Sequence, residues 1–441
     1  MKKARKFSSL FPLGVMKDQK RILQIALPAM VENFLQMLMG VVDSYLVASL
    51  GIVAISGVAV ANNIIIIYQA LFIALGAAVS SLLSKSKGQQ DEGRIAYHAT
   101  ESIKLTVLIS LVLGIVSIFW GQPLLHLLGA EKDVTQQGGL FLAIVGGGVI
   151  SMGLMTTLGS LVRVYGNPSL PMYASIFTNL LNAVISALAI YVLGWGIAGV
   201  ALGTILSRAI GAYLLWSSLD LPFERPRWGL DRDLISIALP AAGERLMMRA
   251  GDVVVLVLIV RFGTEAVAGH SIGEILTQFI YMPVFGVATA AVMLVAEALG
   301  EHNWSSIERL RRETYWLSLI FMTPIALLIW ALGQPLTHLF TQNATATQVS
   351  LLVALFSLLG IPMTAGTVIY TAVWQGLGRA NLPFYATTVG MWIIRIGIGW
   401  FLGIVLHLGL PGVFAGTLLD NGFRWLFLGT LYRENKRKHA L

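Results

Sequence analysis

Residues 26–51 read ALPAMVENFLQMLMGVVDSYLVASLG, and this stretch decides the fold of the chain. Only two of its residues are charged, Glu32 and Asp43, and most of the others are apolar. A helix needs about 20 such residues to cross the hydrocarbon core of a bilayer. The stretch therefore predicts a membrane-spanning helix that carries two ionisable groups.

The rest of the chain has the same character. Its 441 residues are 56% hydrophobic and 12% charged, whereas soluble proteins are about 25% charged. There is no cysteine, which excludes disulfides and thiolate metal sites. We predict an all-α polytopic membrane protein of twelve transmembrane helices. The predicted spans are 22–48, 53–83, 102–120, 138–161, 171–193, 197–218, 234–260, 266–298, 315–333, 349–374, 383–406 and 411–431.

The basic residues give this arrangement an orientation. With both termini in the cytoplasm, 23 of the 30 Lys and Arg residues fall in cytoplasmic segments and five fall within spans. Only Lys132 and Arg261 fall in segments on the external side of the membrane. An excess of basic residues on the cytoplasmic side is the rule for helical membrane proteins. We therefore expect a multi-pass protein of the bacterial cytoplasmic membrane. The basic balance does not predict nucleic-acid binding, because no soluble domain carries it.

The chain repeats itself at an offset of 212. LPAMVE at 27–32 matches LPAAGE at 239–244, and GQPLLHL at 121–127 matches GQPLTHL at 333–339. Glycines match as well, with Gly57 and Gly88 corresponding to Gly269 and Gly300. Each repeat holds six helices, so the two lobes should be parallel and related by a pseudo-two-fold axis along the membrane normal. We predict an N-terminal lobe at 1–219, a cytoplasmic linker at 220–233 and a C-terminal lobe at 234–441.

The opening stretch resembles the first helix of the MATE (multidrug and toxic compound extrusion) family, whose V-D-(S/T) pattern is matched by Asp43. The twelve spans, the repeat length and the GQPLLHLLGA segment also fit, so the resemblance covers essentially the whole chain. It implies two six-helix lobes that exchange a cation moving inward for a drug-like molecule moving outward. No cofactor is expected, and the coupling ion is H⁺ or Na⁺.

The resemblance also implies a coupling site. Matched positions in relatives supply an Asp on helix one, an Asn and an Asp on helix five, and a Thr on helix six. Here they are Asp43, Asn182, Ser186 and Thr204. The replacement of the second carboxylate by Ser186 leaves proton binding as an alternative to a Na⁺ site at Asp43. A purely structural role, with the carboxyl held by neighbouring amides and hydroxyls, is the alternative for Asp43.

A second set of residues is predicted to face a substrate cavity. Glu32 and Gln36 share a helix face with Asp43, and Arg249 lies three residues before Asp252 on the seventh helix. Arg249 is expected to pair with Asp252, Asp420 is expected to pair with Arg424, and Glu297 is expected to be solvated. An ion-pair ladder with a structural role is the alternative for the seventh helix. The predicted cavity residues are Glu32, Gln36, Asn179, Met155, Met172, Arg249, Asp252 and Glu274.

The sequence therefore predicts a cation-coupled antiporter that acts as a monomer and exports organic cations or amphipathic drugs by alternating access. One alternative is a flippase for lipid-linked precursors, which the intramembrane arginines would suit. An intramembrane enzyme would need a nucleophile–base or metal set, and the sequence shows none. A channel is less suited to a duplicated two-bundle design.

Overall fold

The computed structural model describes residues 17–220, 223–224 and 228–439, and the basic residues Lys2, Lys3, Arg5, Lys6, Arg225 and Arg227 lie outside them. No strand occurs in this described part of the chain. The first half forms α1 (Lys17–Ala48), α2 (Ile52–Gly88), α3 (Glu92–Leu127), α4 (Lys132–Gly147), α5 (Ile150–Tyr165), α6 (Leu170–Tyr191) and α7 (Gly196–Ser217). The second half forms α8 (Arg232–Val260), α9 (Thr264–Gly300), α10 (Trp304–Ala331), α11 (Gly333–His338), α12 (Ala344–Leu359), α13 (Ile361–Gly376), α14 (Asn381–Val389), the π-helical segments η2 (Gly390–Ile398) and η3 (Phe401–Val405), and α15 (Gly409–His439).

These helices account for the twelve predicted spans. Eight spans are long and apolar enough by themselves, one of them being the run Asn381–Val405. Two more are bent pairs, α4–α5 with an angle of 42° and α12–α13 with an angle of 60°. The remaining two are α8 and α15, whose intramembrane charges lower their apolar character. The polytopic all-α fold is therefore confirmed.

The two bends are features that the sequence reading did not anticipate. The first follows the glycine run Gly146–Gly148, and the second lies at Gly360, just before Pro362. Glycine and proline are the usual causes of sharp helix breaks. The GQPL segments, most of which lie between predicted spans, are helical. The first continues α3 to Leu127, and the second forms α11.

The repeat is visible in the turns between helices. Gln90 and His302, which are related by the 212 offset, both have φ of 56°. Each is followed by a helix N-cap, Asp91 for α3 and Asn303 for α10, whose side chain accepts a hydrogen bond from a backbone N–H three residues further on. The duplicated sequence thus encodes the same turn twice.

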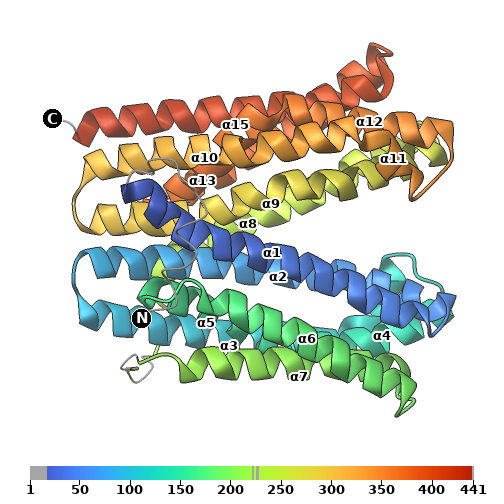
Figure 1. Cartoon of the computed structure of the whole chain (residues 1–441), viewed down its shortest axis with the longest axis horizontal. Coiled ribbons are helices and arrows are strands. Elements are labelled where there is room, and N and C mark those ends of the chain that lie inside the picture. Colours follow the sequence, from blue (N-terminus) through green and yellow to red (C-terminus); the bar gives the residue numbers. More distant parts are fainter. Residues whose placement is uncertain (1–16, 221–222, 225–227, 440–441) are drawn as a thin grey trace.

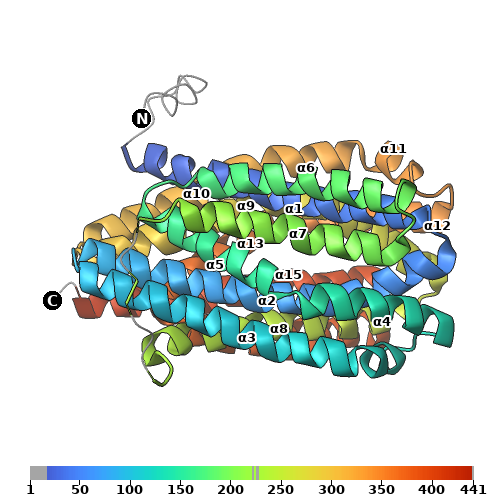
Figure 2. The same cartoon turned by 90° about the horizontal axis from the view of Figure 1, so that it is seen from below.

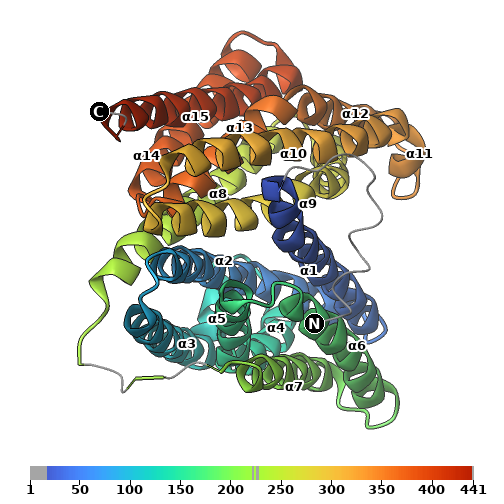
Figure 3. The same ribbon diagram turned by 60° about the vertical axis from the view of Figure 1, so that its left-hand side comes forward.

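The halves form two bundles that lie side by side along their length (Figure 1). The second view shows the same bundles from below (Figure 2), and the third shows α1 and α2 facing α9 and α8 across the boundary (Figure 3). We call the end that carries the turns at 89–91 and 301–303 and the α7–α8 connection the linker end. The opposite end, which carries the GQPL segments, is the GQPL end.

The hydrophobic core shows how the halves meet. The largest cluster combines side chains of both halves, including Leu75 and Leu83 of α2 with Val287 and Leu294 of α9. Two other clusters each belong to one half only. One runs from Val47 to Ala201, and the other runs from Val255 to Phe414. Both contain residues near the GQPL end. The halves therefore share a core toward the linker end and have separate cores toward the other end.

The α7–α8 connection is anchored to α3. His98 Nδ1 and Asp231 Oδ2 share a hydrogen bond of 2.7 Å, and both side chains are buried. Asp231 also caps α8 by accepting from the backbone N–H groups of Asp233 and Leu234. Burial by itself would raise the pKa of the Asp231 carboxyl, but the hydrogen bond and charge of His98 and the two N–H groups outweigh it. The pKa of Asp231 is held below its ordinary value.

This anchor predicts a pH-dependent stability difference. Asp231→Asn keeps a helix cap but exchanges a charged hydrogen bond for a neutral one, which should cost roughly 1 kcal/mol at pH 7. Because the native pKa is lowered, the wild-type advantage is complete above about pH 4 and is lost as the pH falls through the native pKa. Chemical unfolding in detergent between pH 7 and pH 3 measures it. The exposed Asp233 on the same turn supplies the control Asp233→Asn. An advantage that already vanishes near pH 6 would contradict the assignment to Asp231.

Candidate functional site

The predicted coupling residues of the first half come together between α1 and α6. Asn182 Nδ2 donates to Asp43 Oδ1 at 2.7 Å, and Ser186 Oγ donates to Asn182 Oδ1 at 3.2 Å. Asn182 and Ser186 are fully buried, while Asp43 is partly buried. The contact between Asn182 and Asp43 bridges residues 139 positions apart. A chain of three polar groups therefore starts at the one carboxylate of this cluster.

α7 closes one side of this cluster. A Cβ placed on Gly203 would lie 2.5 Å from Ser186 Oγ and 3.4 Å from Asn182 Oδ1, so α7 and α6 touch at this level. Thr204 is buried beside the contact, but its Oγ1 donates to Val200 O of its own helix at 3.0 Å and not to Asp43. One turn further on, Arg208 and Asp43 interact electrostatically. Thr204 therefore adjoins the carboxylate cluster without being bonded to it.

The other predicted residues of the first half are bonded separately. Glu32 accepts from Arg163 Nη2 at 2.5 Å, an ion pair that the sequence reading missed because Arg163 was placed in a cytoplasmic segment. Gln36 Oε1 accepts from Gln69 Nε2 at 3.1 Å, and Asn179 Nδ2 donates to the carbonyl of Leu35 at 2.8 Å.

Of the two methionines predicted for the cavity, Met155 belongs to a packing contact. Met155 Sδ lies 3.3 Å from the position of a Cβ on Gly211 of α7, and its side chain packs against the largest core cluster. Met172 on α6 is partly buried. Neither methionine is joined to the Asp43 cluster by a contact that the structure records, so their cavity role stays a prediction.

The second half holds a network of buried charges around Asp420. Arg395 Nη2 lies 2.8 Å and Arg424 Nε lies 2.9 Å from the Asp420 carboxylate, whose side chain is fully buried. Arg424 Nη1 donates to Thr387 Oγ1 at 3.3 Å, and that hydroxyl donates to Glu244 Oε1 at 3.2 Å. The predicted pairing of Asp420 with Arg424 is confirmed. Arg395 has no acidic partner nearby in the sequence, and it forms the second ion pair of Asp420.

The expected pair of Arg249 with Asp252 is wrong as a contact. Asp252 Oδ1 pairs instead with Arg395 Nη1 at 3.4 Å, and about half of the Asp252 side chain is exposed. Arg249 and Glu274 are exposed. Arg249 interacts electrostatically with Asp252, and Glu274 interacts electrostatically with Asp252 and Arg395. Arg395 lies in the π-helical segment η2, and π-helical turns are frequent at functional sites. In the folded protein Asp252 therefore pairs with a residue of η2 and not with a residue of its own helix.

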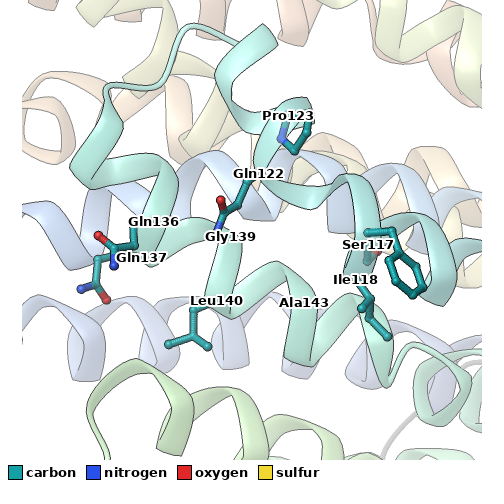
Figure 4. Close-up of a pocket in the computed structure, with 10 residues that line it drawn as sticks. Ser117, Ile118, Gln122, Pro123, Gln136, Gln137, Gly139, Leu140 and Ala143 are labelled. Atoms are coloured by element: carbon teal, nitrogen blue, oxygen red, sulfur yellow. The ribbon is translucent and has the colours of Figure 1, made fainter.

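A pocket of about 580 Å³ lies between α3 and α4, near the GQPL end (Figure 4). Its polar lining comes from Ser117, Gln122, Gln136 and Gln137, and Gln122 lies against Gly139. None of the residues predicted from the sequence lines it. The pocket is therefore separate from both charged clusters.

Comparisons with known proteins identify the family. The MatE family model matches residues 28–188 and again 240–401, which reproduces the duplication. A probable multidrug resistance protein NorM of Thermotoga maritima is 25% identical over 424 residues, 92% of this chain and 90% of the relative. The uncharacterized transporter YisQ of Bacillus subtilis is 27% identical over 425 residues, 92% of each chain.

Solved structures share the fold. A MATE crystal structure in the bent conformation has a TM-score of 0.90 at 19% identity and covers 96% of this chain and 97% of that one. The outward-facing conformation of a multidrug resistance MATE family transporter has a TM-score of 0.89 at 19% identity and covers 97% of both chains. Since the family model covers most of both halves, this chain belongs to the MatE family of multi-pass membrane transporters.

Proposed function

We propose that this protein is a cation-coupled antiporter that exports small amphipathic molecules, with Asp43 as the carboxyl that couples ion movement to transport. The observation that carries the proposal is the chain Asp43–Asn182–Ser186 between two membrane helices. A charged group within a membrane span costs roughly 2.5–3.5 kcal/mol on insertion scales, and such groups commonly serve transport. The names of curated relatives such as NorM support multidrug export as the activity.

The basic residues support an orientation in the membrane. The linker end carries Lys85, Lys87 and Arg94 around the α2–α3 turn, and Arg309, Arg311 and Arg312 follow the α9–α10 turn. This charge distribution supports a cytoplasmic location for the linker end. The halves share a core there and have separate cores at the other end. In this orientation the shared core would hold the two halves together at the cytoplasmic end.

The polar groups around Asp43 are compatible with one exchangeable cation at its carboxylate. Asn182 presents its N–H group to Asp43 and its carbonyl to Ser186, so a proton on Asp43 leaves the cluster unchanged. Na⁺ binding would need the Asn182 amide to turn its oxygen toward Asp43, since Na⁺ takes oxygen ligands. Arg208 adds a positive charge that also acts on Asp43. Both H⁺ and Na⁺ therefore enter the test.

The test is transport by the purified full-length protein in proteoliposomes, with ethidium as a cationic amphiphile. An imposed pH or Na⁺ gradient should drive ethidium against its concentration gradient, and the gradient that does so identifies the ion. A potential of 100 mV adds about 2.3 kcal/mol per charge. The alternative is a flippase for lipid-linked precursors, which the intramembrane arginines favour. Movement of a fluorescent polyprenyl phosphate between leaflets, without gradient-driven ethidium transport, would replace the antiporter by the flippase.

A further inference from the structure

Two glycines related by the sequence repeat meet where the two halves close. Gly88 ends α2 and Gly300 ends α9, and the two helices are equivalent in the duplication. A Cβ built on Gly300 would lie 3.1 Å from the Cα of Gly88 and would collide with the carbonyl oxygen of Lys85. A Cβ built on Gly88 would collide with the carbonyl oxygen of Glu297. No side chain fits between the two helix ends.

The contact is reciprocal. Gly300 packs on the carbonyl of Lys85, and Gly88 packs on the carbonyl of Glu297. Lys85 and Glu297 are themselves separated by 212 positions, so these two carbonyls are also equivalent in the repeat. Such self-complementary contacts are typical of two-fold axes, where the same patch is used on both sides. The pseudo-two-fold axis of the molecule therefore passes close to the Gly88–Gly300 contact.

Other contacts across the same boundary depend on this close approach. Ser81 Oγ on α2 donates to the carbonyl of Gln375 on α13 at 2.8 Å, and Ser81 is buried. The Glu297 carboxylate pairs with Arg21 Nη2 of α1 at 2.6 Å, so the expectation that Glu297 is solvated is wrong. Arg21 is half exposed, and a pair of this kind contributes little by itself. The contact between the two glycines, in contrast, would be disrupted by a single added methyl group.

We propose that Gly88 and Gly300 form the closing contact of the cytoplasmic gate, and that the missing side chains set the balance between the closed and open states. An added methyl group would meet backbone atoms, which cannot rotate away as a flexible side chain can. The halves would have to separate at the linker end, and that is the motion that opens the protein toward the cytoplasm. The inference rests on the proposed antiporter function, in which the halves open alternately to the two sides of the membrane.

The test uses the absence of cysteine in the native chain. Ser81→Cys in the full-length protein places one thiol in the closed boundary. A membrane-impermeant maleimide, added to inside-out vesicles, then reports opening. We expect Gly88→Ala to raise the labelling rate about tenfold, which corresponds to a tenfold shift in the open-to-closed ratio. Gly300→Ala should do the same, because its contact is the symmetric equivalent, and it serves as an independent variant.

Gly57→Ala and Gly269→Ala are the matched controls. These glycines lie on the same two helices and are also repeat-related, but they pack on α4 and α12 within their own halves. They should lower thermal stability without increasing labelling of the folded, monodisperse fraction. Unchanged labelling in both gate variants, or an equal rise in the controls, would overturn the proposal. The assay needs no substrate or ion gradient, so its failure is distinguishable from failure of the antiporter proposal.

Discussion

We expect Asp43→Asn to lower gradient-driven transport at least about tenfold. The variant should still fold and still bind substrate. The amide has nearly the same shape as the carboxyl but can neither carry charge nor exchange a proton. Asn182 can keep its hydrogen bond to the remaining oxygen, so the α1–α6 contact survives. The substitution also removes the cost of desolvating a charge within the membrane, so we do not expect the variant to be less stable.

The measurement is ethidium transport in proteoliposomes under imposed pH and Na⁺ gradients, beside ethidium binding by the same variant without a gradient. Asp133→Asn is the control, because it also removes one carboxyl from a membrane helix. Asp133 is exposed in the first turn of α4 and belongs to neither charged cluster. The control should keep its coupling to the gradient. Transport by Asp43→Asn that still follows the gradient would exclude Asp43 from the mechanism.

The sequence was sufficient to predict the architecture because two strong signals agree. Apolar runs of membrane length define spans by themselves, and the 212-residue offset places each span in one of two halves. The bends at Gly146–Gly148 and Gly360 were missed, because small residues serve both helix packing and helix breaks. The pattern alone does not separate these two uses.

Predictions for single residues succeeded where spacing along one helix decides the contact. Asp420 and Arg424 are four positions apart, and their pair forms as expected. Asp252 has Arg249 three positions away, yet it pairs with Arg395, 143 positions further along the chain. The same holds for Glu32 with Arg163 and for Asp231 with His98. A distant arginine or histidine leaves no local signal, and only the packing of helices decides such partners.

The second large effect concerns Asp420. Asp420→Ala should destabilise the protein by about 3–5 kcal/mol, because it leaves the buried Arg424 and the nearly buried Arg395 without the carboxylate that compensates both. The free energy of unfolding in detergent, from denaturant titration of the full-length protein, measures this loss. Asp252→Asn is the control and should change stability by less than about 1 kcal/mol, since Asp252 is half exposed and Arg395 keeps its pair with Asp420.

A double substitution separates the value of the ion pair from the cost of breaking it. Replacing a buried pair by apolar side chains of similar volume is often neutral, whereas removing one partner leaves a charge without compensation. Asp420→Leu combined with Arg424→Met should therefore recover a large part of the stability lost in Asp420→Ala. Arg395 would then pair with Asp252 alone, which it already contacts at 3.4 Å. If the double variant is as unstable as the single one, the network contributes through its own attraction and not through mutual compensation of buried charges.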